Sequence, residues 1–188
     1  MSKKLVLFIT LIFIVSTFIL SITAAFITKE MNSNNIITFG NIKIESNVTT
    51  ENNNKEEKIN NGDSFDITYN SNINRNVQVK NVGDHPAFIR VSFELIGRTK
   101  QKEIIDIKSL VEIKQKDKNW RYKDGWYYYA QELQSKKETT KLSAFFEFDI
   151  DEITAKYPGI SITLDINVEA VQAENNKNVF EAEGWPTN

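Results

Sequence analysis

The side chains that most often carry enzyme chemistry are scarce in this sequence. Among 188 residues there is no cysteine and a single histidine, His85. Without cysteine, thiol catalysis, zinc–thiolate sites, iron–sulfur clusters and disulfides are excluded. His85 lies in a Gly-Asp-His-Pro segment, and we interpret it as a turn residue, because carboxylates alone would have to complete a metal site. The sequence also lacks His-Glu-x-x-His, Gly-x-Ser-x-Gly and a glycine-rich phosphate loop.

Clustered carboxylates offer the other route to metal chemistry. Asp149, Asp151 and Glu152 supply oxygen ligands of the kind that calcium prefers. They lack the Asp-x-Asp-x-Asp-Gly spacing of a dedicated calcium loop, and we interpret them as part of a solvated face. We therefore predict no catalytic residue, no metal site and no cofactor, and a protein that is not an enzyme.

The densest aromatic cluster is a candidate binding surface. It consists of Trp126, Tyr127, Tyr128 and Tyr129. In a strand, Trp126 and Tyr128 would face one side and the other two tyrosines the opposite side, so one pair could be exposed. Exposed aromatic side chains can stack on sugars or fill a partner's pocket. Ordinary strand packing explains the same pattern, and both interpretations remain open.

Residues 1–25 have the layout of a secretory signal peptide. Two lysines precede an apolar stretch over residues 5–20, and small residues follow. Thr23 and Ala25 stand at the −3 and −1 positions of a signal-peptidase cleavage before Phe26. An uncleaved transmembrane anchor is the alternative, since about 20 apolar residues can span a bilayer. Either interpretation exports the remainder, so we expect contact with the membrane only during export.

The charge of the remainder argues against nucleic acid as a partner. Leaving out the two lysines of residues 1–25, 21 basic side chains stand against 25 acidic ones, a net charge of −4. Nucleic-acid binding draws most of its free energy from neutralised phosphates, which an acidic chain supplies poorly. Within the chain, residues 97–123 carry +5 and residues 124–188 carry −7. This asymmetry could favour head-to-tail contacts between copies, or it could reflect charged strand edges that resist aggregation.

Alternation of apolar and polar residues dominates the exported part and predicts antiparallel strands. The longest examples are residues 87–95, 142–150 and 160–170. Turn signals such as Asp124-Gly125 and Pro158-Gly159 separate the segments. We expect about eight strands in an all-β, antiparallel two-sheet sandwich that is jelly-roll-like. We also expect an N-terminal signal helix and at most one or two short helices, including one over residues 151–157.

The first strand differs from the rest because a long polar segment follows it. We predict an N-terminal assembly strand segment over residues 26–45, a polar asparagine-rich linker over residues 46–62 and a β-sandwich body over residues 63–188. The candidate assembly residues are Ile36, Ile37, Phe39, Gly40, Ile42 and Ile44. The parity of the apolar residues switches at Gly40, which could host a β-bulge. An ordinary first strand with a glycine kink is the other interpretation.

Several segments in a fixed order resemble one family. They are Thr-Ala-Ala-Phe at 23–26, Ile-Thr-Phe-Gly-Asn-Ile-Lys-Ile at 37–44, Lys-Asn-Val-Gly-Asp at 80–84, Ala-Phe-Ile-Arg-Val at 87–91, Asp-Gly-Trp-Tyr-Tyr-Tyr at 124–129, Thr-Lys-Leu at 140–142 and Glu-Ala-Val-Gln-Ala at 169–173. With these segments the chain resembles the TasA, camelysin and BsaA group of exported biofilm-matrix proteins, which a SipW-type signal peptidase processes. The BsaA-like members are the most similar.

The resemblance implies a secreted structural subunit of an extracellular biofilm-matrix fibre in a Gram-positive bacterium. It implies head-to-tail self-assembly by donation of an N-terminal β-strand, with SipW-type signal peptidase and accessory matrix proteins as further partners. The protease label of camelysin is not carried over, because His-Glu-x-x-His is absent. A monomeric cell-surface adhesion module that uses the aromatic strand is the alternative. Which sheet edge would accept the donated strand is left open by the sequence.

Overall fold

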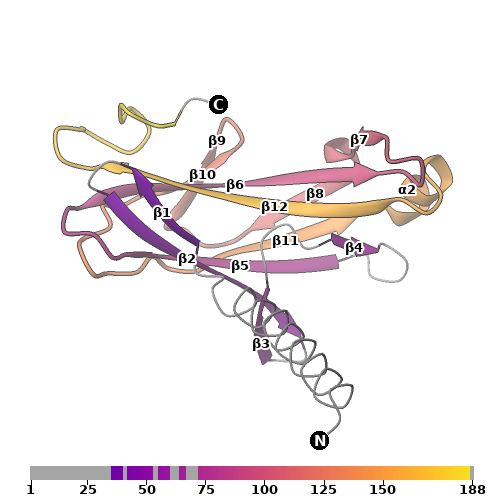
Figure 1. Ribbon diagram of the computed structural model, residues 1–188, viewed down its shortest axis with the longest axis horizontal. Helices are drawn as coiled ribbons and strands as arrows, with labels where there is room; N and C mark the ends of the chain where they lie inside the picture. Colours follow the sequence, from indigo (N-terminus) through magenta and orange to yellow (C-terminus); the bar gives the residue numbers. More distant parts are fainter. Residues whose placement is uncertain (1–34, 40–41, 53–54, 60–63, 67–71, 187–188) are drawn as a thin grey trace, which may run out of the picture. The chain divides into compact units, whose positions relative to one another are not determined.

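The computed structural model describes residues 35–39, 42–52, 55–59, 64–66 and 72–186. The chain divides into two units, residues 1–34 and residues 35–188, and all of the described residues belong to the second. The predicted signal peptide and its helix therefore lie outside the described residues. In the second unit two antiparallel sheets pack face to face, which confirms the predicted all-β, two-sheet class (Figure 1).

Each sheet contains six strands among the described residues. Sheet A consists of β1 (Asn35–Phe39), β2 (Ile42–Asn52), β3 (Lys55–Lys58), β5 (Asn72–Asn81), β8 (Val111–Gln115) and β11 (Leu142–Phe148). Sheet B consists of β4 (Ser64–Asp66), β6 (Ala87–Arg98), β7 (Ile104–Asp106), β9 (Trp120–Lys123), β10 (Trp126–Tyr129) and β12 (Ser161–Gln172). Sheet A runs in the order β1-β2-β5-β11-β8, with β3 on β2; sheet B runs β4-β12-β6-β10-β9, with β7 on β6.

The alternating segments form the strands that build the core. β6 and β12 pair over their whole length, from Ala87 opposite Gln172 to Arg98 opposite Ser161. On β6 the inward positions are all buried: Ala87, Ile89, Val91, Phe93 and Leu95. β11 repeats the pattern from sheet A. The ring of Phe146 meets that of Phe93 edge to face at 5.3 Å, so the two inner faces interlock across the sandwich.

Turns and the short helix form where the sequence indicates. Asp124 and Gly125 both have positive φ, +50° and +85°, and connect β9 to β10 as a two-residue hairpin. Helix α2 (Ile150–Lys156) matches the predicted helical turns. The carboxylate of Asp149 accepts a hydrogen bond from the backbone N–H of Glu152 and caps the helix. Asp149 is one of the three carboxylates considered for a calcium site, and its role as a helix cap explains its position.

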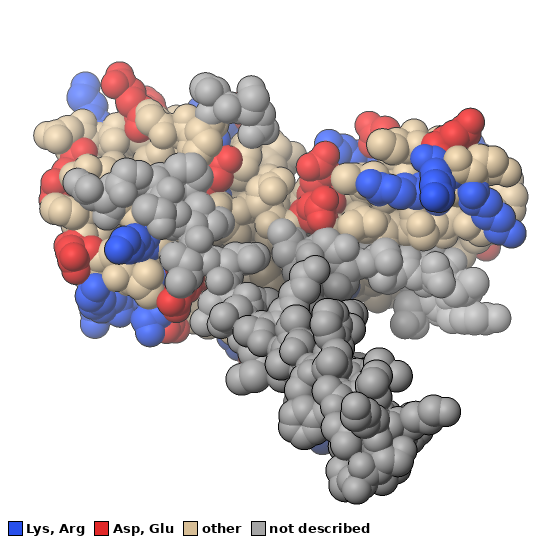
Figure 2. Space-filling view, viewed as in Figure 1, with Lys and Arg blue, Asp and Glu red and all other residues tan. Residues whose placement is uncertain are grey.

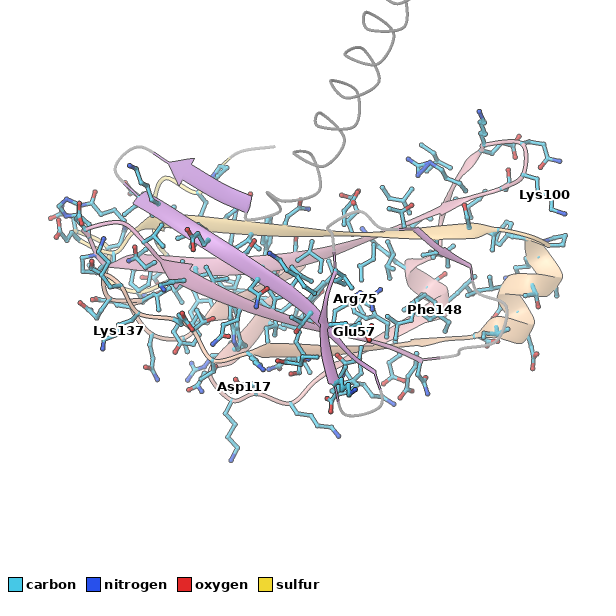
Figure 3. The ribbon with its side chains drawn as sticks, turned by 60° about the horizontal axis from the view of Figure 1, so that its bottom comes forward. Glu57, Arg75, Lys100, Asp117, Lys137 and Phe148 are labelled. Carbon is cyan, nitrogen blue, oxygen red and sulfur yellow. The ribbon has the colours of Figure 1, made fainter. Side chains whose placement is uncertain are left out.

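The predicted linker over residues 46–62 does not match the structure. β2 continues to Asn52 and pairs with β5 from Ile44 opposite Asn81 to Thr49 opposite Asn76. β3 then folds back on the end of β2. The guanidinium of Arg75 on β5 donates to the hydroxyl of Thr50 on β2 at 3.3 Å, which further holds β2 in the sheet. Arg75 is labelled in Figure 3. The polar composition misled the prediction because β2 buries the polar side chains of Ser46 and Thr49 as well as apolar ones.

The predicted single strand over residues 36–44 is a pair of strands. β1 and β2 are antiparallel, with Phe39 opposite Ile42 and Ile37 opposite Ile44. The parity switch at Gly40 therefore coincides with a reversal of chain direction. Residues 40 and 41 themselves lie outside the described residues.

The C-terminal segment covers the outer face of sheet B. Six buried residues form a second apolar cluster there: Phe88, Tyr128, Val171, Ala173, Val179 and Ala182. Arg90 of β6 lies between the rings of Trp126 and Trp185, at 4.1 and 4.5 Å from their centroids. It pairs with Glu169 on β12 at 2.6 Å, and both side chains are about nine-tenths buried. This stacked ion pair fastens residues after β12 to the sheet.

Candidate assembly surface

β1 is an edge strand that lacks the usual protection. It pairs only with β2 among the described residues, and β12 of the same molecule lies beside it without forming a ladder. Its sequence, Asn-Ile-Ile-Thr-Phe, contains no charged residue, and β-branched and aromatic residues favour strands. Charged side chains normally keep exposed edges from pairing with other chains. Each of the short strands β3, β4, β7, β8 and β9 carries at least one.

The candidate assembly residues divide between an edge and the core. Ile36, Ile37 and Phe39 lie on β1. Ile42 and Ile44 lie on β2 and are only 2% and 0% exposed, so they belong to the body of the sandwich. A donated strand that included them would open the core. The structure therefore narrows the part of residues 26–45 that could be supplied to another molecule to residues up to Phe39.

The opposite edge of sheet A is β8, and its inner face is incompletely covered. β8 pairs only with β11 among the described residues. Val111 and Ile113 point inward but remain half-buried, whereas the equivalent residues of β11 are buried. The neighbouring edge of β6 in sheet B is also paired only in part. β6 pairs with β10 at Arg90 and Val91 and with β7 from Ile96 onward. β10 and β7 lie toward opposite ends of β6 in Figure 1.

The half-buried residues of β8 and the unpaired stretch of β6 border a groove of about 520 Å³ between the sheets. Its lining residues are Phe93 and Leu95 of β6, Val111, Ile113 and Gln115 of β8, Lys108, and Tyr122, Gly125 and Tyr127 of the β9–β10 hairpin. The groove is within the size range of ligand pockets. Apolar and aromatic side chains predominate among its lining residues, and polar atoms contribute about half of its surface. Of its side chains only Lys108 is charged. We refer to these residues as the β8 groove.

The charges of β8 are held away from the groove. Glu112 and Lys114 are exposed and alternate with the inward residues. Lys114 pairs with Glu147 of β11 at 2.6 Å and with Glu112 at 3.6 Å. The hydrogen bond to Glu147 raises the pKa of Lys114, with a smaller contribution from Glu112. The edge strand thus presents charge on its outer face and an apolar surface on its inner face.

The aromatic segment does not form the exposed surface that one interpretation of the sequence allowed. Tyr127, Tyr128 and Tyr129 are only 6–7% exposed. Tyr127 packs edge to face on Phe93, and Tyr128 packs beneath the C-terminal segment. Burial raises the pKa of the Tyr127 hydroxyl, and the neighbouring Tyr122 raises it further. The large exposed aromatic here is Tyr122, at 65%, in the preceding strand.

Substitutions of two tyrosines should show which of them contributes to the packing of the core. Tyr127→Ala is expected to lower the free energy of unfolding by about 3 kcal/mol, because it removes a buried ring from the core. Tyr122→Ala should change stability by less than about 0.5 kcal/mol, since most of its ring is in water. Urea unfolding of both variants checks this. Equal losses for the two would contradict the assignment of Tyr127 to the core.

Other candidate chemistry finds no geometric support in the described part of the chain. No group of three or more His, Cys, Asp or Glu side chains there could hold a metal ion. His85 lies in a bend before β6, with its Nδ1 3.5 Å from a carboxylate oxygen of Glu174. Within the same ranges, no helix has the length and apolar character needed to cross a membrane. Acidic and basic side chains are interspersed at both ends of the face shown in Figure 2, which does not favour charge-driven head-to-tail contacts through that face.

The cleavage residues Thr23, Ala25 and Phe26 lie outside the described residues, so the structure does not bear on them. No known family matched the chain, and no curated protein or solved structure matched it either.

Proposed function

We propose that this protein is a secreted structural subunit of an extracellular biofilm-matrix fibre. Subunits assemble head to tail when an N-terminal β-strand of one copy pairs with the next. The observation that carries the proposal is β1, an uncharged edge strand at the start of the sandwich, where every other short edge strand bears charge. Such an edge presents unpaired backbone donors and acceptors and readily accepts another strand.

Addition of a strand to a sheet edge accounts for a chain of subunits. Main-chain hydrogen bonds supply affinity, and alternate side chains supply specificity. β1 lies at one end of sheet A and β8 at the other, so the surface that gives a strand differs from any that receives one. A contact between two different surfaces need not close on itself and can propagate into a filament.

The sequence supports the same role. Residues 1–25 resemble a signal peptide, which would place the body outside the cell or at its surface, and the segment order resembles that of biofilm-matrix proteins. SipW-type signal peptidase is the processing partner that this resemblance implies, with the protein itself as the main binding partner. The burial of Tyr127, Tyr128 and Tyr129 leaves the alternative adhesion module without its aromatic surface.

Sedimentation velocity of the processed chain, residues 26–188, tests the proposal. We expect a broad distribution of large species whose size increases with protein concentration, because head-to-tail addition has no defined end point. A monomer at every concentration would overturn the proposal, and so would a discrete closed oligomer.

A further inference from the structure

We propose that the β8 groove is the site that accepts β1 from a second copy of this chain. The inference rests on the proposed function and adds the receiving surface to it. β1 of one copy pairs along the free edge of β8 in the next, and its side chains of one parity enter the groove. Sheet A then continues from one molecule to the next.

The backbone geometry supports this pairing. β1 and β8 are each five residues long, so one strand can satisfy the free edge of the other without overhang. Among the described residues β1 forms a ladder with β2 alone, so one short ladder at most must rearrange there to supply it. On sheet B, no described strand pairs with β6 on the groove side between Val91 and Ile96, which leaves room beside the free edge of β8.

The apolar lining supports it as well. Val111 and Ile113 already pack against the core but are only half-buried, as expected where a covering strand is missing. Residues 31–39 carry no charged side chain. Their entry therefore brings no charged side chain into the groove, where removing a charge from water would be costly. Ile37 and Phe39 have the alternating spacing that a strand needs to place two apolar side chains on one face.

The remaining edges are poorer acceptors. β3 is four charged residues in a row, and β9 carries Arg121 and Lys123 beside the exposed Tyr122. β4 and β7 are three residues each, too short to hold a five-residue partner. The outer edge of β12 lies beside β1 and β2 of its own copy. β8 is the edge that combines sufficient length with an uncovered apolar face.

Cysteine cross-linking tests the contact directly, because the natural chain has no cysteine. One preparation of residues 26–188 carries Ile37→Cys and a second carries Ile113→Cys. Mixed and treated with a short bismaleimide, they should give a covalent dimer of the two species. The matched control replaces Ile113→Cys with Ile104→Cys, an isoleucine of β7 that is 72% exposed and outside the groove. It should give no such dimer.

A charge in the groove provides the second measurement. Ile113→Lys should raise the protein concentration needed for polymers at least tenfold, because each 1.4 kcal/mol of lost affinity corresponds to a factor of ten. Ile104→Lys should leave that concentration unchanged. Circular dichroism and urea unfolding verify that both variants fold.

The outcomes separate this inference from the proposed function. Cross-linking of Ile37→Cys to Ile113→Cys, with polymers weakened only by Ile113→Lys, supports the groove. Polymers that form normally without this cross-link, or that cross-link equally well to Ile104→Cys, overturn the groove and leave strand donation in place. Absence of polymers from the unsubstituted chain overturns the proposed function itself.

Discussion

A chain that begins at Gly40 is expected to remain monomeric at concentrations where the chain from Phe26 forms polymers. The deletion removes β1, the uncharged edge strand, and leaves β2 paired with β5 and β3. The buried residues Ile42 and Ile44 stay in place. Since a cross-strand pair contributes about 0.2–1 kcal/mol, losing the five pairs of β1 should lower the free energy of unfolding by roughly 1–5 kcal/mol.

Electron microscopy and urea unfolding of the truncated chain measure the two parts of this expectation. A chain that begins at Asn35 is the matched control, because it retains β1 and should still polymerise. Normal filaments from the chain that begins at Gly40 would count against β1 as the donated strand. An unfolded product would instead show that β1 is part of the body, which the edge position of the strand argues against.

Arg90→Ala should be among the most destabilising single substitutions in the described part of the chain. It leaves the carboxylate of Glu169, which is 8% exposed, buried without its partner. Breaking a buried ion pair in this way costs about 3–5 kcal/mol. The rings of Trp126 and Trp185 also lose the guanidinium between them, and the backbone carbonyl of Pro186 loses a hydrogen bond. Urea unfolding provides the measurement.

Two controls define the cause of that loss. Arg98→Ala, at the exposed end of β6, should change the free energy of unfolding by less than about 0.5 kcal/mol. The double variant Arg90→Met/Glu169→Leu should recover much of the stability lost in Arg90→Ala, because no buried charge remains uncompensated. A double variant no more stable than the single one would show that stacking on the tryptophans, rather than the ion pair, holds the C-terminal segment.

The long strands could be predicted from the sequence because each buries one face. In β6, β11 and β12 the inward residues are apolar and most of the outward residues are polar, so period-two alternation is clear. Phe88 and Val171 are outward and apolar, and the C-terminal segment packs on them. β2 and β3 escaped prediction for the opposite reason. Beyond Val48, β2 buries Thr49 rather than an apolar residue, and β3 is exposed throughout. These segments are strands because their backbones pair with neighbouring strands, and the pattern of apolar residues does not reveal that pairing.

The candidate site was only partly predictable. The sequence indicated that the first strand and Gly40 differ from the rest of the chain. It could not distinguish a β-bulge from a hairpin, because both switch the parity of the apolar residues. The β8 groove could not be located, because its walls come from β6, β8 and the β9–β10 hairpin, which are distant in sequence. One signal was available: Val111 and Ile113 alternate with Glu112 and Lys114, as in a strand with one wet and one apolar face.

Filament length in electron micrographs, measured as the chain that begins at Gly40 is added to the intact processed chain, tests the central claim most directly. The truncated chain can receive β1 but cannot supply it, so it should terminate growth at one end. We expect mean length to fall steadily with the proportion of truncated chain, and label on that chain to appear at filament tips alone. Filaments of unchanged length that exclude the truncated chain, or that carry it along their whole length, would contradict growth by passage of β1 from copy to copy.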